Sequence, residues 1–375
     1  MPPSKNKKTA KDPIPQATAA WDLLSPLRQY FGFDAFRGNQ EAIINNVLNG
    51  KDTFVIKPTG GGKSLCYQLP AMISEGCAIV VSPLIALMKN QVDLVRGYSS
   101  NDNVAHFLNS TLTKKEIREV HEDLNAGTTK MLYVAPETLT RQENLDFFSD
   151  LKISFFAVDE AHCISDWGFD FRPDYQRLAR ALLSTPTASV LATTATANER
   201  VTLDIGKQLG ATTVTFRGTL ARTSLTLSVV PGLSPLQRYA WIADALEQLP
   251  GSGIVYVLTV AEAERLTAFL RSCGHEVDAY SGQTDAETRL KVEERLRHNQ
   301  VKAVVATSAL GMGYDKPDLG FCVHVGSPST PVAYYQQVGR AGRAVAHAEG
   351  VLLPSDADER IWDYFATASI PDPTT

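Results

Sequence analysis

Three successive glycines followed by a lysine and a serine are the residues of this chain that most clearly predict a chemistry. An apolar run, residues 53–57, leads into them, and a segment suited to a helix begins at Leu65. Glycines let backbone N–H groups approach phosphate oxygens, and a helix N-terminus adds partial positive charge. A lysine supplies a full charge for β- and γ-phosphates, and a serine hydroxyl is a ligand for Mg²⁺. The sequence therefore predicts a nucleoside triphosphate site made by these residues: Thr59, Gly60, Gly61, Gly62, Lys63 and Ser64.

The match to a phosphate loop has one departure. The full pattern G-x-x-x-x-G-K-[ST] begins with glycine, and this chain has Lys57 at that position. The alternative interpretation is a glycine-rich turn between a strand and a helix that does not bind nucleotide.

Two acids form a second candidate group. Asp159 and Glu160 follow an apolar strand expected at residues 155–159. Functional groups in open α/β sheets lie at the carboxyl ends of strands, so we expect both acids to face the phosphate loop. Asp159 is predicted to hold Mg²⁺ through water, and Glu160 to orient and deprotonate an attacking water. A plain turn after a strand is the alternative.

A third strand is expected at residues 189–193 and ends in hydroxyl-bearing residues. Thr194 and Thr196 are predicted to hydrogen-bond Glu160 or His162 and so to report the state of the nucleotide. Taken without the acids, the segment is only a threonine-rich strand end.

Two arginines three positions apart, Arg340 and Arg343, are expected on one face of a helix, because positions i and i+3 are neighbours there. Planar guanidinium groups suit a γ-phosphate and its developing charge, so either arginine is a candidate arginine finger. A basic helix face is the alternative, although it does not account for Gly339 and Gly342 within that helix.

The segment before the phosphate loop indicates a base-binding site. Two helices are expected between residues 21 and 50, and aromatic residues, an arginine and Gln40 lie between them. An amide can pair with both N6–H and N7 of adenine while an aromatic ring stacks on its face. A hydrophobic staple before the second helix is the alternative.

The 375-residue length favours two domains. Strands alternate with helices, and the strands are continuous apolar runs, which indicates two α/β domains with mostly parallel sheets flanked by helices. We expect a disordered basic tail at 1–18, a first domain at 19–216, an interdomain connection at 217–235 and a second domain at 236–375. The expected strands are residues 53–57, 78–82, 131–134, 155–159 and 189–193 in the first domain, and 253–257, 276–280, 302–307 and 321–325 in the second.

Composition narrows the class of protein. With 44% hydrophobic residues, a net charge of −5 and no apolar run of spanning length, we expect a soluble globular protein with no membrane partner. Any binding of nucleic acid must come from local patches. The cysteines have no C-x-x-C spacing, so we expect reduced core thiols in a cytosolic protein and no zinc site. They are Cys66, Cys77, Cys163, Cys273 and Cys322.

Taken together, the ordered motifs resemble those of RecQ-family DNA helicases of superfamily two, over residues 30–355. The motifs that carry the resemblance are residues 36–40, 58–64, 82–88, 159–168, 311–313 and 339–343. The resemblance implies two RecA-like lobes, hydrolysis of ATP with Mg²⁺, and 3′-to-5′ translocation on single-stranded DNA with unwinding of forked DNA. It also implies a role in DNA repair or recombination, and a cytoplasmic, nucleoid-associated location in a bacterium.

The resemblance also implies roles for single residues. Phe33 would stack on adenine while Arg37 and Gln40 contact its edge. His162 would couple the lobes. Arg340 and Arg343 would contact the γ-phosphate, with Arg343 the arginine finger.

An aromatic-rich loop at residues 167–173 resembles the family's sensor of single-stranded DNA. Bases stack on aromatic rings with little sequence preference, which contributes about 1–3 kcal/mol per base, and an arginine can bind phosphate or stack. The predicted DNA-binding residues are Trp167, Phe169, Phe171 and Arg172. The family has a histidine at the place of Phe169 and an arginine at the place of Val260. Its zinc module and winged helix have no counterpart here, so we expect weak affinity for duplex DNA.

Three alternatives to a DNA helicase remain. A DNA-stimulated ATPase would translocate without separating strands efficiently. An RNA helicase shares the Asp-Glu-Ala-His sequence, but residues 36–40 and 163–168 argue against it. A phosphotransferase or nucleotide switch would have no need of arginines on a second domain and would show no stimulation by DNA.

Overall fold

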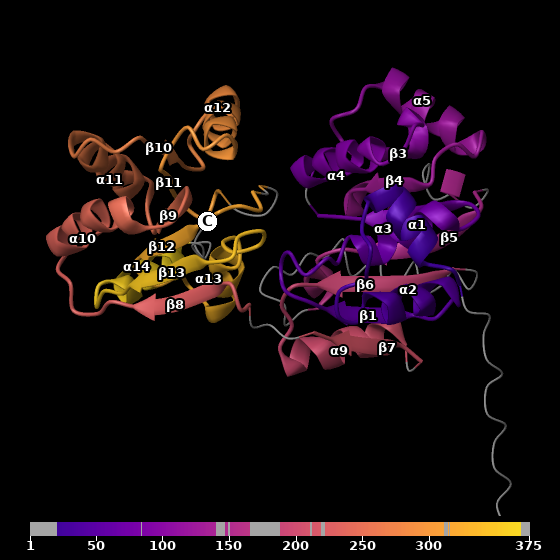
Figure 1. Cartoon of the computed structure of the whole chain (residues 1–375), viewed down its shortest axis with the longest axis horizontal. Coiled ribbons are helices and arrows are strands. Elements are labelled where there is room, and N and C mark those ends of the chain that lie inside the picture. The colour runs from indigo at the N-terminus through magenta and orange to yellow at the C-terminus, as the bar shows by residue number, and fades with distance from the viewer. Residues whose placement is uncertain are drawn as a thin grey trace, which may run out of the picture.

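The computed structural model describes residues 21–83, 85–139, 147–148, 151–165, 188–210, 212–218, 222–310, 314 and 316–368. These residues form two parallel β-sheets, and helices flank each sheet (Figure 1). All described strand pairings are parallel, which confirms the predicted fold class of two α/β domains. The predicted tail at 1–18 lies outside the described residues.

The sheet of the first domain has seven strands in the order β3-β4-β2-β5-β6-β1-β7. The chain crosses repeatedly between strands that are not sequence neighbours, as in doubly wound sheets. The strands are β1 (Thr53–Ile56), β2 (Cys77–Val81), β3 (Ala105–Leu108), β4 (Met131–Val134), β5 (Ile153–Val158), β6 (Ser189–Thr194) and β7 (Val214–Arg217).

Alternate residues of each strand point to opposite faces of this sheet, and a different set of helices covers each face. Val55, Val80 and Ala157 pack with α1 (Leu24–Phe31), α2 (Gln40–Leu48), α3 (Leu65–Ile73) and α4 (Ile85–Gly97). Their neighbours Phe54 and Phe156 pack on the other face with α5 (Lys114–Asn125) and α9 (Glu199–Leu209). Short helices are η1 (Asp102–Val104), α6 (Pro136–Leu139) and η2 (Ala161–Ile164).

The second domain has a six-stranded sheet in the order β10-β11-β9-β12-β13-β8. Its strands are β8 (Leu225–Val229), β9 (Gly253–Val257), β10 (Val277–Tyr280), β11 (Ala303–Ala306), β12 (Phe321–Val325) and β13 (Ala348–Leu353). Helices α10 (Pro235–Gln248) and α11 (Val260–Ser272) cover one face. Residues of α12 (Ala286–Arg297) and α13 (Pro331–Val338) cover the other, and α14 (Asp358–Ala368) follows β13.

The chain passes between the two sheets earlier than predicted. The first sheet ends with β7 at Arg217, and β8, which begins at Leu225, already pairs with β13 of the second sheet. The predicted connection at 217–235 therefore contains a whole strand, and only residues 218–224 join the sheets. This strand was missed because it lies at a sheet edge, where Leu227 and Val229 are exposed and polar residues alternate with them.

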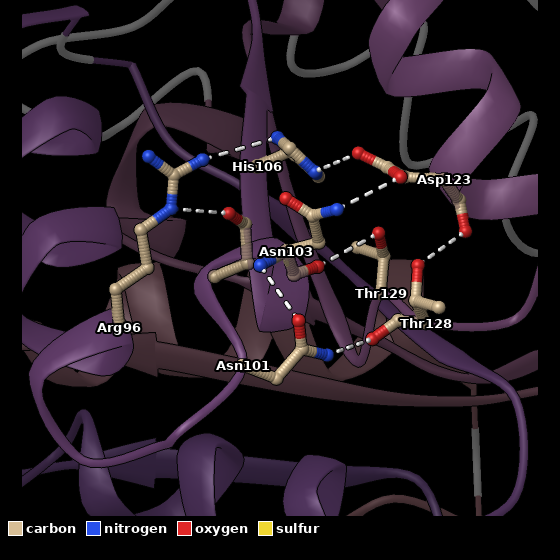
Figure 2. Close-up of polar contacts among 8 residues, drawn as sticks. Arg96, Asn101, Asn103, His106, Asp123, Thr128 and Thr129 are labelled. Carbon is tan, nitrogen blue, oxygen red and sulfur yellow. Dashed lines mark hydrogen bonds and ion pairs between the residues drawn. The ribbon is translucent and has the colours of Figure 1, made fainter.

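A polar network stabilises the free edge of the first sheet (Figure 2). Arg96 donates through Nη2 to Nδ1 of His106 (3.1 Å), so this ring nitrogen must be the acceptor, and Nε2–H donates to Asp123 (2.9 Å). Asp123 also accepts from the amide of Asn103 (3.0 Å). Burial, and secondarily the charge of Arg96, lowers the pKa of His106, which favours the neutral ring that this network requires.

Four of the five cysteines are buried, as predicted, but Cys273 is exposed. Cys273 is the C-cap of α11, where the apolar pattern of the helix ends. Among the described residues, no helix is both long and apolar enough to span a membrane. Within the same ranges, no group of three or more histidine, cysteine or acidic side chains is arranged to hold a metal ion.

Candidate active site

The predicted phosphate loop connects the carboxyl end of β1 to the start of α3. Gly60 and Gly62 have φ of +75° and +73°, a conformation that residues with a Cβ rarely adopt. A Cβ on Gly61 would lie 2.8 Å from the carbonyl oxygen of Pro58, to which its own N–H donates. The glycines are therefore required by the shape of the loop.

Lys63 folds back over this loop and donates from Nζ to the carbonyl oxygen of Lys57 (3.2 Å). Ser64 is the N-cap of α3. Lys57, at the position where the motif departs from its usual glycine, is only 6% exposed. Burial lowers the pKa of Lys57, and the charge of Lys63 lowers it further, so the loop holds two lysines whose charges interact.

The two predicted acids lie beside the loop because β5, β6 and β1 are neighbours in the sheet. Oδ1 of Asp159 accepts from the hydroxyl of Thr193 (2.7 Å) and from the N–H of Glu160 (3.0 Å). Burial raises the pKa of Asp159, Glu160 raises it further, and Lys63 opposes the shift. Glu160 has a φ of +51°, which is uncommon for a residue with a side chain and occurs where function outweighs backbone strain.

A chain of polar contacts leads from these acids to the second domain. Nδ1 of His162 lies 2.9 Å from the Thr194 hydroxyl and 3.4 Å from a Glu160 oxygen. The Thr194 hydroxyl donates to the carbonyl of Thr196 (3.1 Å), so His162 must be the donor to Thr194. Gln336 of α13 then reaches the Thr196 hydroxyl at 3.5 Å. The predicted hydrogen bond between Thr194 and His162 is thus confirmed.

The predicted base-binding residues lie at and before the start of α2, which Gln40 connects to the phosphate loop. Phe33 is 45% exposed and Arg37 is also exposed. Gln40 is buried, accepts from the N–H of Arg37 (2.7 Å) and donates to the carbonyl of Gly62 (3.1 Å). Its amide thus joins the start of α2 to the phosphate loop, and its contact with adenine stays a prediction.

The prediction for the two arginines is wrong in one respect. Helix α13 ends at Val338, so Arg340 and Arg343 do not share a helix face. Gly339 is the C-cap, and Gly342 has a φ of +74°, which turns the chain into a loop. We name residues 339–344 the arginine loop.

The two arginines point to different places. Arg340 is 8% exposed and donates from Nη1 to the carbonyl of Tyr314 (2.9 Å) inside the second domain. The side chain of Arg343 reaches the first domain and packs against Gly60. If Gly60 carried a Cβ, that atom would lie 3.0 Å from Cγ and Cδ of Arg343. The structure therefore brings Arg343 to the phosphate loop, whereas Arg340 is held within its own domain.

One residue of this site was missed by the sequence analysis. Arg222, in the connection between the sheets, donates to the carbonyl of Thr59 in the phosphate loop and to the carbonyls of Gly339 and Ala341 in the arginine loop. No motif marks this arginine, and its partners are all backbone oxygens, so side-chain types gave no signal for it.

The residues present fit a magnesium nucleotide. Lysines and backbone N–H groups for phosphates, the Ser64 hydroxyl and the Asp159 carboxylate meet at one edge of the sheet. Burial, and secondarily the charge of Glu160, raises the pKa of Asp159, and a bound divalent cation would favour its ionised form. The predicted DNA-binding residues Trp167, Phe169, Phe171 and Arg172, and the motif at 311–313, lie outside the described residues.

Comparison with known proteins identifies the family. Residues 37–205 match the DEAD/DEAH box helicase family, and residues 237–345 match the helicase conserved C-terminal domain. The chain is 37% identical over 338 residues to the probable ATP-dependent DNA helicase RecS of Bacillus subtilis, covering 90% of this chain and 67% of that protein. The chain belongs to the RecQ family of helicases. The ATP-dependent DNA helicase RecQ of Pasteurella multocida is 39% identical over 358 residues, 95% of this chain and 55% of that protein.

The resemblance of the sequence to the RecQ family is thereby confirmed, and this RecQ-family chain spans about half the length of several curated relatives. Solved structures agree on the fold. The Mycobacterium smegmatis helicase Lhr, solved with single-stranded DNA and AMP-PNP, aligns with a TM-score of 0.68 at 23% identity, over 88% of this chain and 47% of that one. Dbp5 of S. cerevisiae, solved with RNA and ADP BeF3, aligns at 0.69 and 16% identity, over 92% and 90%.

Proposed function

We propose that this protein is an ATP-dependent DNA helicase that translocates 3′-to-5′ on single-stranded DNA and unwinds forked duplexes. The observation that carries the proposal is the contact between Arg343 of the second domain and the phosphate loop of the first, in a RecQ-family chain. A nucleotide held between two domains links its hydrolysis to their relative movement, which is what a motor on DNA requires.

The residues divide the chemistry between them. Lys63 and the loop N–H groups bind the β- and γ-phosphates, while Ser64 and Asp159 hold Mg²⁺. When bound there, Mg²⁺ would neutralise part of the phosphate charge. Glu160 orients the attacking water and accepts its proton, and Arg343 stabilises the charge that develops on the γ-phosphate.

Coupling between the lobes uses the polar chain described above. Glu160 contacts His162, which donates to Thr194, and Thr196 meets Gln336 of the second domain. A change at the γ-phosphate that moves Glu160 therefore alters, through these contacts, the position of Gln336 in the second domain. We further propose that the helicase serves DNA repair or recombination in the bacterial cytoplasm, at the nucleoid.

The direct test is strand separation. We would mix the protein with a labelled duplex that carries a single-stranded 3′ tail, a duplex that carries only a 5′ tail, and a blunt duplex, each with Mg²⁺ and ATP. The proposal predicts unwinding of the 3′-tailed substrate, and none with a non-hydrolysable analogue. ATP hydrolysis stimulated by DNA but without strand separation would instead support the translocase alternative. Equal activity on 5′-tailed DNA would contradict the proposed direction.

A further inference from the structure

Arg222 is the described residue whose side chain hydrogen-bonds the backbone of both loops that face the nucleotide site. Nη1 donates to the carbonyl oxygens of Gly339 (2.8 Å) and Ala341 (2.5 Å). Nη2 donates to the carbonyl of Thr59. Because a guanidinium is planar and holds its donors in a fixed fork, three carbonyls on one arginine define the spacing of the segments that carry them.

The arginine loop is held on both sides. On one side, the N–H of Gly342 donates to Leu319 (3.0 Å) and that of Ala344 donates to Pro317 (2.8 Å). On the other side, Ser224 donates from Oγ to the carbonyl of Gly342 (2.6 Å), next to the Arg222 contacts. The backbone that carries Arg343 is therefore clamped between the segment before β12 and the connection before β8.

We infer that Arg222 is a positioning residue that sets the place of Arg343 against the phosphate loop, so that the interdomain connection takes part in assembling the active site. Its contact with Thr59 joins the connection to the first domain, and its contacts with the arginine loop join it to the second. Closure of the two domains then brings Arg343 to one defined position. This inference rests on the proposed ATP hydrolysis at that site.

The chain offers a matched control. Arg289 also donates to two backbone carbonyls, those of Ser281 (3.3 Å) and Gly282 (2.6 Å), but both lie within the second domain. Arg289→Ala thus removes a guanidinium of the same kind without touching the nucleotide site. Arg222→Lys keeps the charge but loses the fork, and Ser224→Ala removes a separate support of the same loop.

Steady-state hydrolysis separates placement from binding. Arg222→Ala should lower kcat roughly tenfold at saturating ATP and DNA, while the Kd for ADP stays within about twofold of wild type, because ADP lacks the γ-phosphate on which Arg343 acts. Arg222→Lys should recover less than half of the loss, Ser224→Ala should lower kcat about threefold, and Arg289→Ala should match wild type. An unchanged kcat in Arg222→Ala, or an equal loss in Arg289→Ala, would overturn the inference.

A double-mutant cycle tests whether Arg222 acts through Arg343. If it does, Arg222→Ala adds less than about twofold to the loss already caused by Arg343→Ala, since the misplaced group is no longer there. If Arg222 supports only the fold, the two losses multiply, which would contradict the inference.

Domain closure gives a readout that needs no turnover. Cys273 is the exposed thiol among the cysteines, so it accepts one dye, and Lys115→Cys on α5 accepts the other, since that lysine is 85% exposed. With a non-hydrolysable ATP analogue, Arg222→Ala should shift energy transfer toward the open distance and Arg289→Ala should not. A wild-type protein that closes but hydrolyses no ATP would refute the proposed function alone. Identical closure in Arg222→Ala and wild type would refute the role of Arg222.

Discussion

Charges of both signs lie close together at the residues of the phosphate loop. Lys63 opposes the rise in the pKa of Asp159 and adds to the fall in the pKa of Lys57. Glu160 stands beside them in a left-handed backbone conformation. Residue types and spacing predicted these groups because phosphate and Mg²⁺ chemistry restricts which side chains serve. They did not predict Arg222, whose partners are backbone oxygens that only the folded chain brings together.

Lys63→Ala should abolish ATP turnover while the fold remains. The ammonium group is the full charge predicted for the β- and γ-phosphates, and charge stabilisation of this kind contributes about 10²–10³ in rate. Phosphate release measures the loss, and circular dichroism verifies the fold. Lys130→Ala is the matched control. That lysine donates to the carbonyl of Ser74 (2.9 Å) and precedes the amino end of β4, whereas the phosphate loop follows the carboxyl end of β1. Wild-type turnover in Lys63→Ala would refute the phosphate-loop assignment.

His324 predicts a pH dependence of the second domain. Burial lowers the pKa of His324 from 6.5 to about 4, and its Nε2 lies 3.0 Å from the Gln337 oxygen. In the unfolded chain the His324 imidazole is protonated below pH 6.5, whereas in the folded domain it is protonated only below about pH 4. Stability is therefore full above pH 6.5 and falls between these values by roughly 3 kcal/mol, at 1.36 kcal/mol per pKa unit.

Urea unfolding followed at several pH values measures this slope. His324→Gln should flatten it between pH 6.5 and 4. His298→Gln is the control, because that histidine is exposed at the end of α12 and should leave the slope unchanged. The same slope in His324→Gln as in wild type would show that other groups cause the pH dependence.

Most strands were predictable from their apolar runs, including the edge strand β10, expected at 276–280, whereas β3, β7, β8 and the interior strand β13 were not. Strands β4, β9 and β12 have the predicted bounds, because a strand buried on both faces is a continuous apolar run. Edge strands β3, β7 and β8 are partly exposed and lack such a run. The end of α13 was mispredicted because Gly339 and Gly342 were taken as part of the helix, although Gly339 is its C-cap and Gly342, with its positive φ, belongs to the loop that follows.

Asp123→Ala should loosen the edge of the first sheet at β3. The carboxylate accepts from His106 and Asn103, both partly buried, and hydrogen bonds to a charged group contribute about 1.5–3 kcal/mol each. We expect a loss of about 3 kcal/mol in the local opening free energy, the low end for two such bonds, which is roughly 150-fold faster amide exchange at residues 105–108. Glu119→Ala is the control, since its pair with Lys115 is exposed. Equal exchange in both variants would mean that the network in Figure 2 does not stabilise the strand.

At the scale of the whole molecule, the site lies between the two sheets. The first sheet contributes its carboxyl edge, and the second contributes the segments that precede β8 and β13. The phosphate loop follows β1, whereas Ser224 and the arginine loop precede β8 and β13. The presence of two such domains followed from chain length and alternation of elements. Residue types and spacing left Arg340 and Arg343 equivalent, because the choice between them depends on packing around Tyr314 and Gly60. Only the resemblance to the RecQ family implied that Arg343 is the arginine finger.

If the aromatic-rich loop couples DNA binding to ATP hydrolysis, changing it should reduce the DNA-stimulated rate more than the basal rate. Phe171→Ala or Arg172→Ala should remove most of the stimulation of ATP hydrolysis by single-stranded DNA, at least about tenfold, with basal hydrolysis within about twofold of wild type, because stacking and phosphate contacts act only on bound DNA. Phe365→Ala, an exposed aromatic residue on α14, is the control. Equal loss of basal and stimulated hydrolysis would assign the loop a structural role.

The measurement that tests the central claim most directly is steady-state ATP hydrolysis with Mg²⁺ in three parallel reactions: without nucleic acid, with single-stranded DNA, and with single-stranded RNA of the same sequence. A DNA-driven motor built on these two domains predicts strong stimulation by DNA, a weaker response to RNA, and loss of both in Arg343→Ala. Hydrolysis that DNA does not change, or that RNA stimulates more than DNA, would contradict the account.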